Sequence, residues 1–203
     1  MELIGYMDSP YVRRVAITAQ FLGIPYSHRE LSVFRDYDEL KKINPQVKVP
    51  TVVCDDGQFV MDSTLIIDYL VSRSGSEALM PSDELNYIHA LNLIGTALVA
   101  MEKAVQLVYE LKHRPEELRY QGWIDRVTEQ MNSALETLET AVGTGTEWLF
   151  GNEPMQADIN AAIAWRFSQL HFPDLAVTEN YPGLVKFSAR AEALPEFKAC
   201  PID

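Results

Sequence analysis

The chain has 203 residues, 47% of them hydrophobic, and its 29 acidic and 17 basic side chains give a formal net charge of −12. This length is enough to bury a core in one large domain or two small ones. The acidic charge works against binding to nucleic-acid backbones and to anionic membrane surfaces. No apolar run approaches the roughly 18 residues of a membrane span, and no signal segment precedes the first strand. We therefore expect a cytoplasmic protein that binds neither nucleic acid nor membrane.

The residues that usually build metal sites and disulfides are few and scattered. Cys54 and Cys200 lie far apart in the chain, so nothing indicates a disulfide framework or a zinc site. The four histidines show neither metal-ligand nor catalytic-triad spacing; they are His28, His89, His113 and His171. We expect no metal.

A strand is expected to turn into a helix near Ser9. Residues 3–6 are mostly apolar, and from Val12 onward apolar residues recur at helical spacing. Ser9 is a favoured N-cap residue, and Pro10 suits the first helical position. A hydroxyl thus lies at the positive end of a helix, where negative charge is favoured. On this stretch alone, Ser9 either caps the helix only or also binds an anionic ligand.

The first 75 residues read as a thioredoxin-like β-α-β-α-β-β-α domain. A second strand is expected at residues 26–31, a short helix at 38–43, a hairpin of strands at 49–54 and 58–61, and a helix from residue 62. The place where this fold often carries Cys-x-x-Cys holds Asp8-Ser9-Pro10-Tyr11. A sulfur that reacts there must therefore arrive with a ligand.

The rest of the chain is expected to be helical. Residues 74–83 form a small, polar connector that contains proline and is typical of a domain boundary. Apolar stripes then predict a long helix at 85–111 and an antiparallel partner over 118–142. Further helices are expected around 159–167 and at 182–193. The predicted fold class is α/β plus all-α, with one domain at residues 1–75 and a helical domain at 84–203.

This arrangement resembles the cytosolic glutathione transferase superfamily over essentially the whole chain, in particular its bacterial members with a serine-type active-site segment. Each supporting motif is weak alone, but their order and spacing are specific. The motifs are Ser9-Pro10-Tyr11-Val12-Arg13-Arg14-Val15, Lys48-Val49-Pro50-Thr51, Asp62-Ser63, and Gly151-Asn152-Glu153-Pro154 with Ala157-Asp158. One departure is Met155, which stands where the family usually has a hydroxyl-bearing N-cap residue.

The resemblance implies which residues bind glutathione as co-substrate. Ser9 would donate a hydrogen bond to the thiolate, with Tyr6 as the competing, tyrosine-type candidate. The backbone of Val49, before a cis Pro50, would pair with the cysteinyl residue of glutathione. Four further side chains complete this set: Asp62 and Ser63 would hold the glutamyl group, Lys48 either reaches the glycyl carboxylate or is solvated, and Phe34 either flanks the ligand or packs.

An electrophile pocket is expected between the domains, lined by Met7, Tyr11 and the helix at 85–111. Arg13 and Arg14 either support an anionic co-substrate or are ordinary exposed helix arginines. The resemblance also implies a homodimer that buries the helices at residues 63–73 and 85–111 against their mates.

The resemblance implies transfer of an alkyl or aryl group to glutathione, with a small electrophile as second substrate. Two alternatives stay open. One is glutathione-dependent peroxide or disulfide reduction. The other is a non-catalytic regulatory protein of the stringent-starvation type. An intact set of Ser9, Val49-Pro50 and Asp62-Ser63 favours the enzyme. A thiol-disulfide reductase that uses Cys54 is disfavoured, because residues 8–11 contain no cysteine.

Overall fold

The computed structural model describes residues 1–76 and 79–202, and its contacts divide the chain into two compact units. The first comprises Met1–Glu77 with Leu194–Asp203, and the second comprises Ala78–Ala193. The sequence had assigned residues 194–203 to the helical domain. The short helix α8 (Pro195–Lys198) instead packs against α1 (Pro10–Phe21), and buried Phe197 and Cys200 anchor it there.

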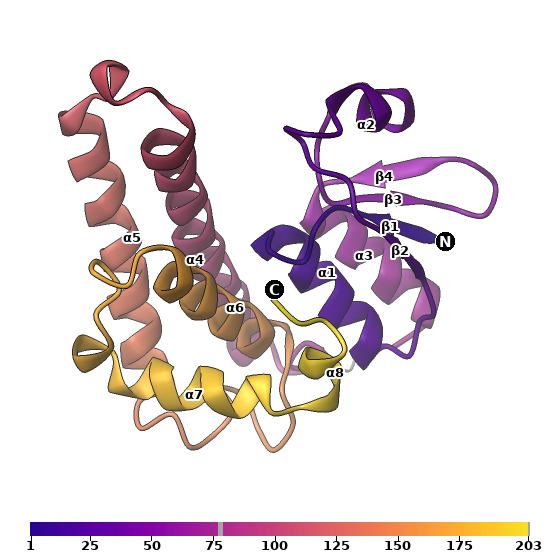
Figure 1. Cartoon of the computed structure of the whole chain (residues 1–203). Helices are drawn as coiled ribbons and strands as arrows, with labels where there is room; N and C mark the ends of the chain where they lie inside the picture. Colours follow the sequence, from indigo (N-terminus) through magenta and orange to yellow (C-terminus); the bar gives the residue numbers. More distant parts are fainter. Residues whose placement is uncertain (77–78, 203) are drawn as a thin grey trace. The chain divides into compact units, whose positions relative to one another are not determined.

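The first unit has the expected order of strands and helices, so the thioredoxin-like prediction is confirmed. After β1 (Glu2–Ile4) and α1 follow β2 (Ser27–Arg29), α2 (Tyr37–Ile43), β3 (Thr51–Val53), β4 (Phe59–Met61) and α3 (Ser63–Ser74). The sheet order is β2-β1-β3-β4, with β1 parallel to β2 and antiparallel to β3. Figure 1 shows α1 and α3 side by side on one face of this sheet.

Apolar side chains of β1 point alternately to the two faces of the sheet, as a strand requires. Ile4 packs with Leu31 and with Leu40 of α2. Leu3, its neighbour, is equally buried. Covering both faces of β1 in this way makes it the centre of the first unit, and the chain leaves β1 directly toward Ser9.

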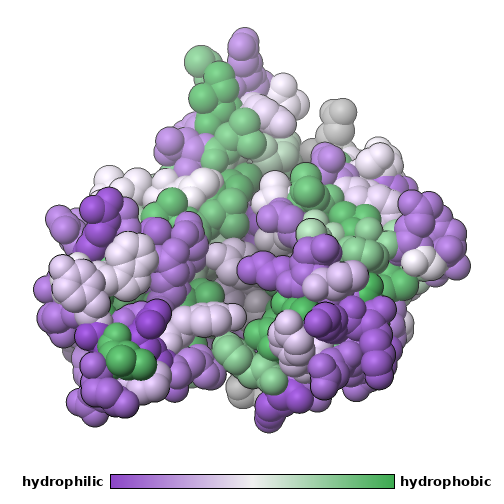
Figure 2. All heavy atoms as spheres, turned by 90° about the horizontal axis from the view of Figure 1, so that it is seen from above, coloured by the Kyte–Doolittle hydropathy of each residue, from purple (hydrophilic) through white to green (hydrophobic). Residues whose placement is uncertain are grey.

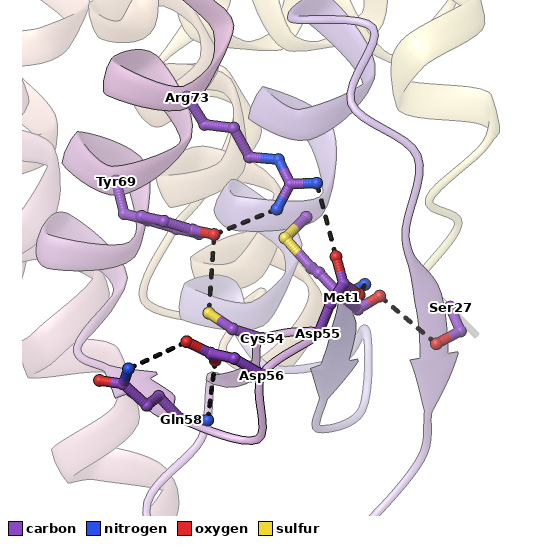
Figure 3. A network of polar contacts seen from close by, with 8 residues as sticks. All are labelled: Met1, Ser27, Cys54, Asp55, Asp56, Gln58, Tyr69 and Arg73. Carbon is purple, nitrogen blue, oxygen red and sulfur yellow. Dashed lines mark hydrogen bonds and ion pairs between the residues drawn. The ribbon is translucent and has the colours of Figure 1, made fainter.

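A polar network ties the β3–β4 turn to α3 (Figure 3). Tyr69 Oη accepts from Arg73 at 3.1 Å and lies 3.6 Å from Cys54 Sγ. Asp55 lies 2.5 Å from the Met1 amine and 3.7 Å from Arg73. These two cations, the amine first, lower the pKa of Asp55. Because Asp55 is exposed, the network orients the turn more than it stabilises the fold.

The second unit is helical, as expected. Its long helices are α4 (Glu84–Val108), α5 (Gln121–Val142), α6 (Gln156–His171) and α7 (Pro182–Glu192), and short helical turns are η1 (Tyr109–His113), η2 (Glu116–Leu118) and η3 (Thr178–Asn180). Figure 1 shows α4 and α5 side by side, joined at one end by η1 and η2. The helix predicted to end at residue 111 remains α-helical to Val108 and closes as a π-helical turn before Pro115.

Residues Glu84–His113 are long and apolar enough to cross a membrane by length and composition. The sequence did not indicate a possible membrane span here, because no uninterrupted apolar run in it approaches the necessary length. In the structure α4 packs against both α5 and α6. Since a core helix of a helical domain passes the same test, one such helix is weak evidence for a membrane span.

Helix α6 begins without a hydroxyl cap, as expected from Met155 at its N-cap. Asp158, three residues later, compensates. Its carboxylate accepts from the backbone N–H of Met155 at 2.8 Å and from that of Leu149 at 2.7 Å. One buried carboxylate thus ties the start of α6 to the segment that precedes it.

Hydrophilic side chains dominate the molecular face in Figure 2, and hydrophobic side chains emerge in separate groups. In the second unit, exposed apolar residues gather on the first turns of α4. Leu85 is 83% exposed, Ile88 58% and Leu91 49%. Their spacing of three residues puts them on one helix face.

Candidate active site

The N-terminus of α1 presents the Ser9 hydroxyl. Ser9 has an extended backbone, and its Oγ accepts from the Val12 N–H at 3.4 Å, while its carbonyl accepts the first helical hydrogen bond from Arg13 at 2.9 Å. Its side chain is half-buried. The cap uses a lone pair of the hydroxyl oxygen, so the hydroxyl proton remains available to a ligand. Capping and ligand binding by Ser9 are therefore compatible.

Tyr6 lies in the loop that leads to Ser9, not within the strand as the sequence suggested, because β1 ends at Ile4. The Tyr6 carbonyl accepts from the Ser9 N–H at 3.1 Å, and the Arg35 guanidinium lies 5.2 Å from the Tyr6 ring centroid. Both candidate donors thus sit on one short loop. Ser9, but not Tyr6, is at the helix terminus.

Gly5 brings the α1 terminus close to the loop before β3. Its φ is +130°, and a Cβ built on it would lie 2.5 Å from Cγ2 of Val12 and 2.9 Å from Cβ of Val49. Only glycine combines this backbone conformation with so close an approach. Sequence reasoning missed Gly5, although a glycine between a strand and a helix cap was its available signal.

The Val49–Pro50 peptide bond is cis, as the resemblance implied. Asn44 organises the loop around it. Its buried amide donates to Thr51 Oγ1 at 2.8 Å, and its Oδ1 accepts from the Gln46 N–H at 3.0 Å. Thr51 in turn donates to the Lys48 carbonyl at 2.7 Å. In the sequence, Asn44 followed by Pro45 is typical only of the end of a helix. Its role in the loop does not show there, because its hydrogen-bond partners Gln46 and Thr51 lie beyond Pro45.

Replacing Asn44 with alanine is expected to weaken about 10-fold the glutathione binding that the resemblance implies, because the lost hydrogen bonds, each worth about 1 kcal/mol, no longer hold residues 46–51 in place. Calorimetric titration with glutathione measures the effect. Thr51→Ser, which keeps the hydroxyl, is the control and should bind nearly as the wild type does. Unchanged affinity in Asn44→Ala would show that the loop is held by its other contacts.

Asp62 and Ser63 form the N-terminus of α3. Asp62 has a φ of +73°, and its carboxylate accepts from the N–H groups of Thr64 at 2.8 Å and Leu65 at 3.3 Å. Asp62 is exposed and Ser63 is buried. The Ser63 hydroxyl oxygen accepts from Arg14 at 2.9 Å. A second helix N-terminus, again with a hydroxyl, therefore belongs to the same unit as Ser9.

Arg13 and Arg14 are not the exposed helix arginines that the sequence allowed, since each is only 1% exposed. Arg13 Nε donates to the Cys200 carbonyl at 2.8 Å, and Arg14 points to the start of α3. Burial lowers the pKa of Arg14 to about 10, against the opposing effect of the Asp62 charge. Both arginines bind protein groups, Arg13 at the Cys200 carbonyl and Arg14 at the Ser63 hydroxyl.

The other two predicted ligand residues lie in loops. Phe34 is 49% exposed between β2 and α2, and Lys48 is exposed next to Val49. Their contact with a ligand stays a prediction. Within residues 1–76 and 79–202, no three or more His, Cys, Asp or Glu side chains form a group that could hold a metal ion.

Two family models cover most of the chain. Residues 3–78 match the description "Glutathione S-transferase, N-terminal domain", and residues 121–190 match "Glutathione S-transferase, C-terminal domain". A maleylacetoacetate isomerase of Pseudomonas aeruginosa is 30% identical over 169 residues, which span 78% of this chain and 77% of that protein. The chain belongs to the glutathione S-transferase family.

Solved structures of glutathione transferases share the fold. A family member from Pseudomonas fluorescens, solved with bound glutathione, is 27% identical, covers 99% of both chains and has a TM-score of 0.85. A glutathione transferase from Methylobacterium radiotolerans, in complex with glutathione sulfonate, has a TM-score of 0.90 at 24% identity over 98% of this chain and 93% of that one. The second likeness shows the fold alone.

Proposed function

We propose that this protein is a glutathione-dependent enzyme that binds glutathione on its first unit and activates the thiolate through Ser9. The observation that carries the proposal is the Ser9 hydroxyl at the N-terminus of α1, whose lone pair caps the helix and whose proton is available to sulfur. Gly5 holds this terminus close to Val49. The bound glutathione of the Pseudomonas fluorescens relative supports the choice of ligand.

The energy required for thiol activation is modest. Lowering a thiol pKa from about 8.5 to about 6.5 needs roughly 2.7 kcal/mol of preferential thiolate stabilisation. A hydrogen bond from the Ser9 hydroxyl to a charged sulfur contributes about 1.5–3 kcal/mol, and the helix terminus about 0.3–1 kcal/mol more. Ser9 therefore acts as a donor and needs neither a histidine nor an aspartate partner.

The remaining groups would hold the two ends of the tripeptide. Val49 would pair its backbone with the cysteinyl residue, as one strand pairs with another. Asp62 would face the glutamyl ammonium, and Ser63 with the α3 backbone N–H groups would face the glutamyl carboxylate. Lys48 would reach the glycyl carboxylate, with Phe34 beside the ligand.

Two reaction classes follow from an activated thiolate. Attack on an electrophile with loss of a leaving group gives conjugation, which we take as the general activity. Reversible addition to an activated double bond gives isomerisation, because bond rotation precedes loss of the thiolate. The 30% identity to a maleylacetoacetate isomerase favours this second candidate. Both classes need the same Ser9 chemistry.

The decisive experiment is calorimetric titration with glutathione, with the ultraviolet absorbance of the thiolate followed across pH. We expect binding at submillimolar concentration and a bound thiol whose pKa lies below that of free glutathione. S-methylglutathione is the control, because it binds without a thiolate signal. No binding of glutathione at millimolar concentration would contradict the enzyme and favour a protein-interaction role.

We further propose that the protein forms a homodimer. The exposed face of Leu85, Ile88 and Leu91 on α4 supports this, because apolar residues that gather on one exposed helix face are typical of an interaction surface. Light scattering should give about twice the chain mass of 23.0 kDa. A mass equal to one chain would refute the dimer.

A further inference from the structure

Arg35 is an exposed cation on the loop between β2 and α2. Its guanidinium lies 5.2 Å from the centroid of the Tyr6 ring. The Tyr6 carbonyl accepts from the Ser9 N–H at 3.1 Å, so Tyr6 and Ser9 belong to one turn. The Tyr6 ring thus holds a positive charge against the turn that presents the Ser9 hydroxyl.

The other arginines of the first unit are engaged by the protein, whereas Arg35 is not. Four of the five arginines in this unit donate to protein oxygen atoms. Their acceptors are the Cys200 carbonyl for Arg13, the Ser63 hydroxyl for Arg14, the Glu39 carboxylate for Arg29 and the Tyr69 hydroxyl for Arg73. Among the residues that the structure describes, none accepts a hydrogen bond from the guanidinium of Arg35. Its N–H groups are therefore available to a ligand.

A turn with internal hydrogen bonds fixes the backbone at Arg35. Ser32 Oγ accepts from the N–H groups of Phe34 and Arg35, each at 3.2 Å. The carboxylate of the next residue, Asp36, is itself engaged, because it accepts from the Ser32 N–H at 2.8 Å. A guanidinium that stacks on an aromatic ring keeps the N–H groups at its edge for other acceptors and loses less freedom on binding. Arg35 is therefore preorganised to bind an anion.

The place of Arg35 indicates which anion it would bind. In the proposed function the two carboxylates of glutathione lie at Lys48 and at the start of α3, and the sulfur lies at Ser9. Of these three places, Arg35 contacts the turn of Ser9. The group that reacts with the sulfur is therefore the ligand closest to Arg35. In a chain with a net charge of −12, an anionic group needs such a local cation.

We propose that Arg35 selects second substrates that carry a carboxylate close to the electrophilic carbon. This inference rests on the proposed function and names the class of its electrophile. The edge of the guanidinium would donate two parallel hydrogen bonds to the carboxylate, while the Tyr6 ring supports its face. Arg35 thus determines substrate specificity, and activation of the thiol stays with Ser9.

The test measures the binding of two glutathione conjugates that differ in this charge. S-carboxyethylglutathione carries a carboxylate on its sulfur substituent, and S-carbamoylethylglutathione carries a neutral amide of the same length. Calorimetric titration gives the dissociation constants of both conjugates and of glutathione. We expect wild-type protein to bind the carboxylate about 10-fold more tightly than the amide, because hydrogen bonds to charged groups are stronger. Since Arg35 is exposed, this preference should shrink at high ionic strength.

Arg35→Gln removes the charge, and Arg29→Gln is the matched control. Arg29 lies on β2 of the same unit but pairs with Glu39. We expect Arg35→Gln to abolish the preference for the carboxylate and to leave the affinity for glutathione and the pKa of the bound thiol unchanged. Arg29→Gln should keep the preference. Arg35→Lys, which keeps the charge but lacks the planar fork, should keep part of it.

Two variants of Tyr6 test the support that its ring gives to Arg35. Tyr6→Leu keeps the backbone carbonyl that binds the Ser9 N–H but removes the ring, so the preference for the carboxylate should fall. Combining Tyr6→Leu with Arg35→Gln should cause no further loss, because the two side chains act together. Tyr6→Phe keeps the ring and should keep the preference.

Equal affinity of wild-type protein for the two conjugates would overturn the inference. An Arg35→Gln variant that loses affinity for glutathione and for both conjugates to the same degree would also overturn it, because Arg35 would then bind glutathione itself. Wild-type protein that fails to bind glutathione would overturn the proposed function instead. The two failures are therefore distinguishable.

Discussion

Replacing Ser9 with alanine is expected to lower glutathione-dependent turnover about 10- to 100-fold at neutral pH, because the thiolate loses a hydrogen bond worth about 1.5–3 kcal/mol. The pKa of the bound thiol should rise by one to two units, by the same arithmetic of about 1.4 kcal/mol per unit. Turnover should recover at alkaline pH, where the thiol ionises without help. Rate measurements from pH 5 to 10, with saturating glutathione, test this expectation.

Two further variants separate the capping role of Ser9 from its ligand role. Ser9→Thr keeps both the cap and the hydroxyl proton and should remain active. Ser9→Asp keeps the cap and complements the helix dipole, so its stability should match or exceed that of the wild type. Its carboxylate would repel the thiolate, and its activity should be lost. A stable and active Ser9→Asp would exclude thiolate stabilisation by this residue.

Tyr6→Phe addresses the competing donor on the same loop. The serine-type mechanism predicts that this variant retains a lowered pKa for the bound thiol. If Tyr6→Phe raises the pKa of the bound thiol while Ser9→Ala does not, Tyr6 and not Ser9 is the donor to the thiolate. The structure makes this comparison necessary, because Tyr6 lies beyond the end of β1 and belongs to the loop that carries Ser9.

Replacing Asp158 with alanine is expected to have the largest effect on stability, roughly 2–4 kcal/mol in the free energy of unfolding. Its side chain is 0% exposed and accepts from the N–H groups of Leu149 and Met155. Alanine would leave both donors unpaired and open a cavity at the start of α6. Urea denaturation followed by circular dichroism measures the loss. A cost below about 1 kcal/mol would show that water replaces the carboxylate.

The stability that Asp158 contributes should depend on pH in the opposite direction to that of a carboxylate with a lowered pKa. Burial raises the pKa of Asp158 from its ordinary value to about 6, although the two hydrogen bonds from backbone N–H groups oppose this shift. Between the unfolded and folded pKa values the folded chain binds more protons, so the contribution of Asp158 to stability is greatest below about pH 4 and falls as pH rises through about 6. A shift of about two units corresponds to about 3 kcal/mol. The cost of Asp158→Ala should therefore be larger at pH 5 than at pH 8.

Asp83 is the control for this direction of the pH dependence, because its pKa is shifted the other way. It caps α4, is exposed, and has a lowered pKa because the backbone and side chain of Asn86 donate to it. Its contribution to stability is present above the ordinary carboxyl pKa and is lost as pH falls. The cost of Asp83→Ala should thus decrease toward acid pH, opposite to that of Asp158→Ala. Equal trends in both variants would contradict the raised pKa of Asp158.

The order of strands and helices could be predicted because each depends on local patterns. Period-two runs, helical apolar spacing and turn residues indicated the four strands and the long helices. Helix α8 was missed because a four-residue helix has no periodicity to detect. The split of the long helix into α4 and a π-helical turn was missed for a related reason, since both parts have the same apolar pattern.

Some residues of the candidate site could be predicted from the sequence and others could not. Ser9, Val49-Pro50 and Asp62-Ser63 could be named from motifs, because they occupy helix starts and a proline turn with recognisable residue types. Asn44 and Gly5 organise the same loops but belong to none of these motifs, and the position of Gly5 between a strand and a helix cap was the only local signal of the two. Arg13 and Arg14 resembled exposed helix residues, because a single helix does not reveal which of its charged faces will be covered.

The sequence by itself determined where helices and strands begin, which residues cap them, and the family to which their order belongs, because these features arise from neighbours along the chain. Only the tertiary structure decided that Arg14 meets Ser63, that Arg13 meets Cys200, and that residues 194–203 return to the first unit. The partners in those pairs are separated by 49 and 187 residues. Their energies depend on burial, which is absent until the units fold.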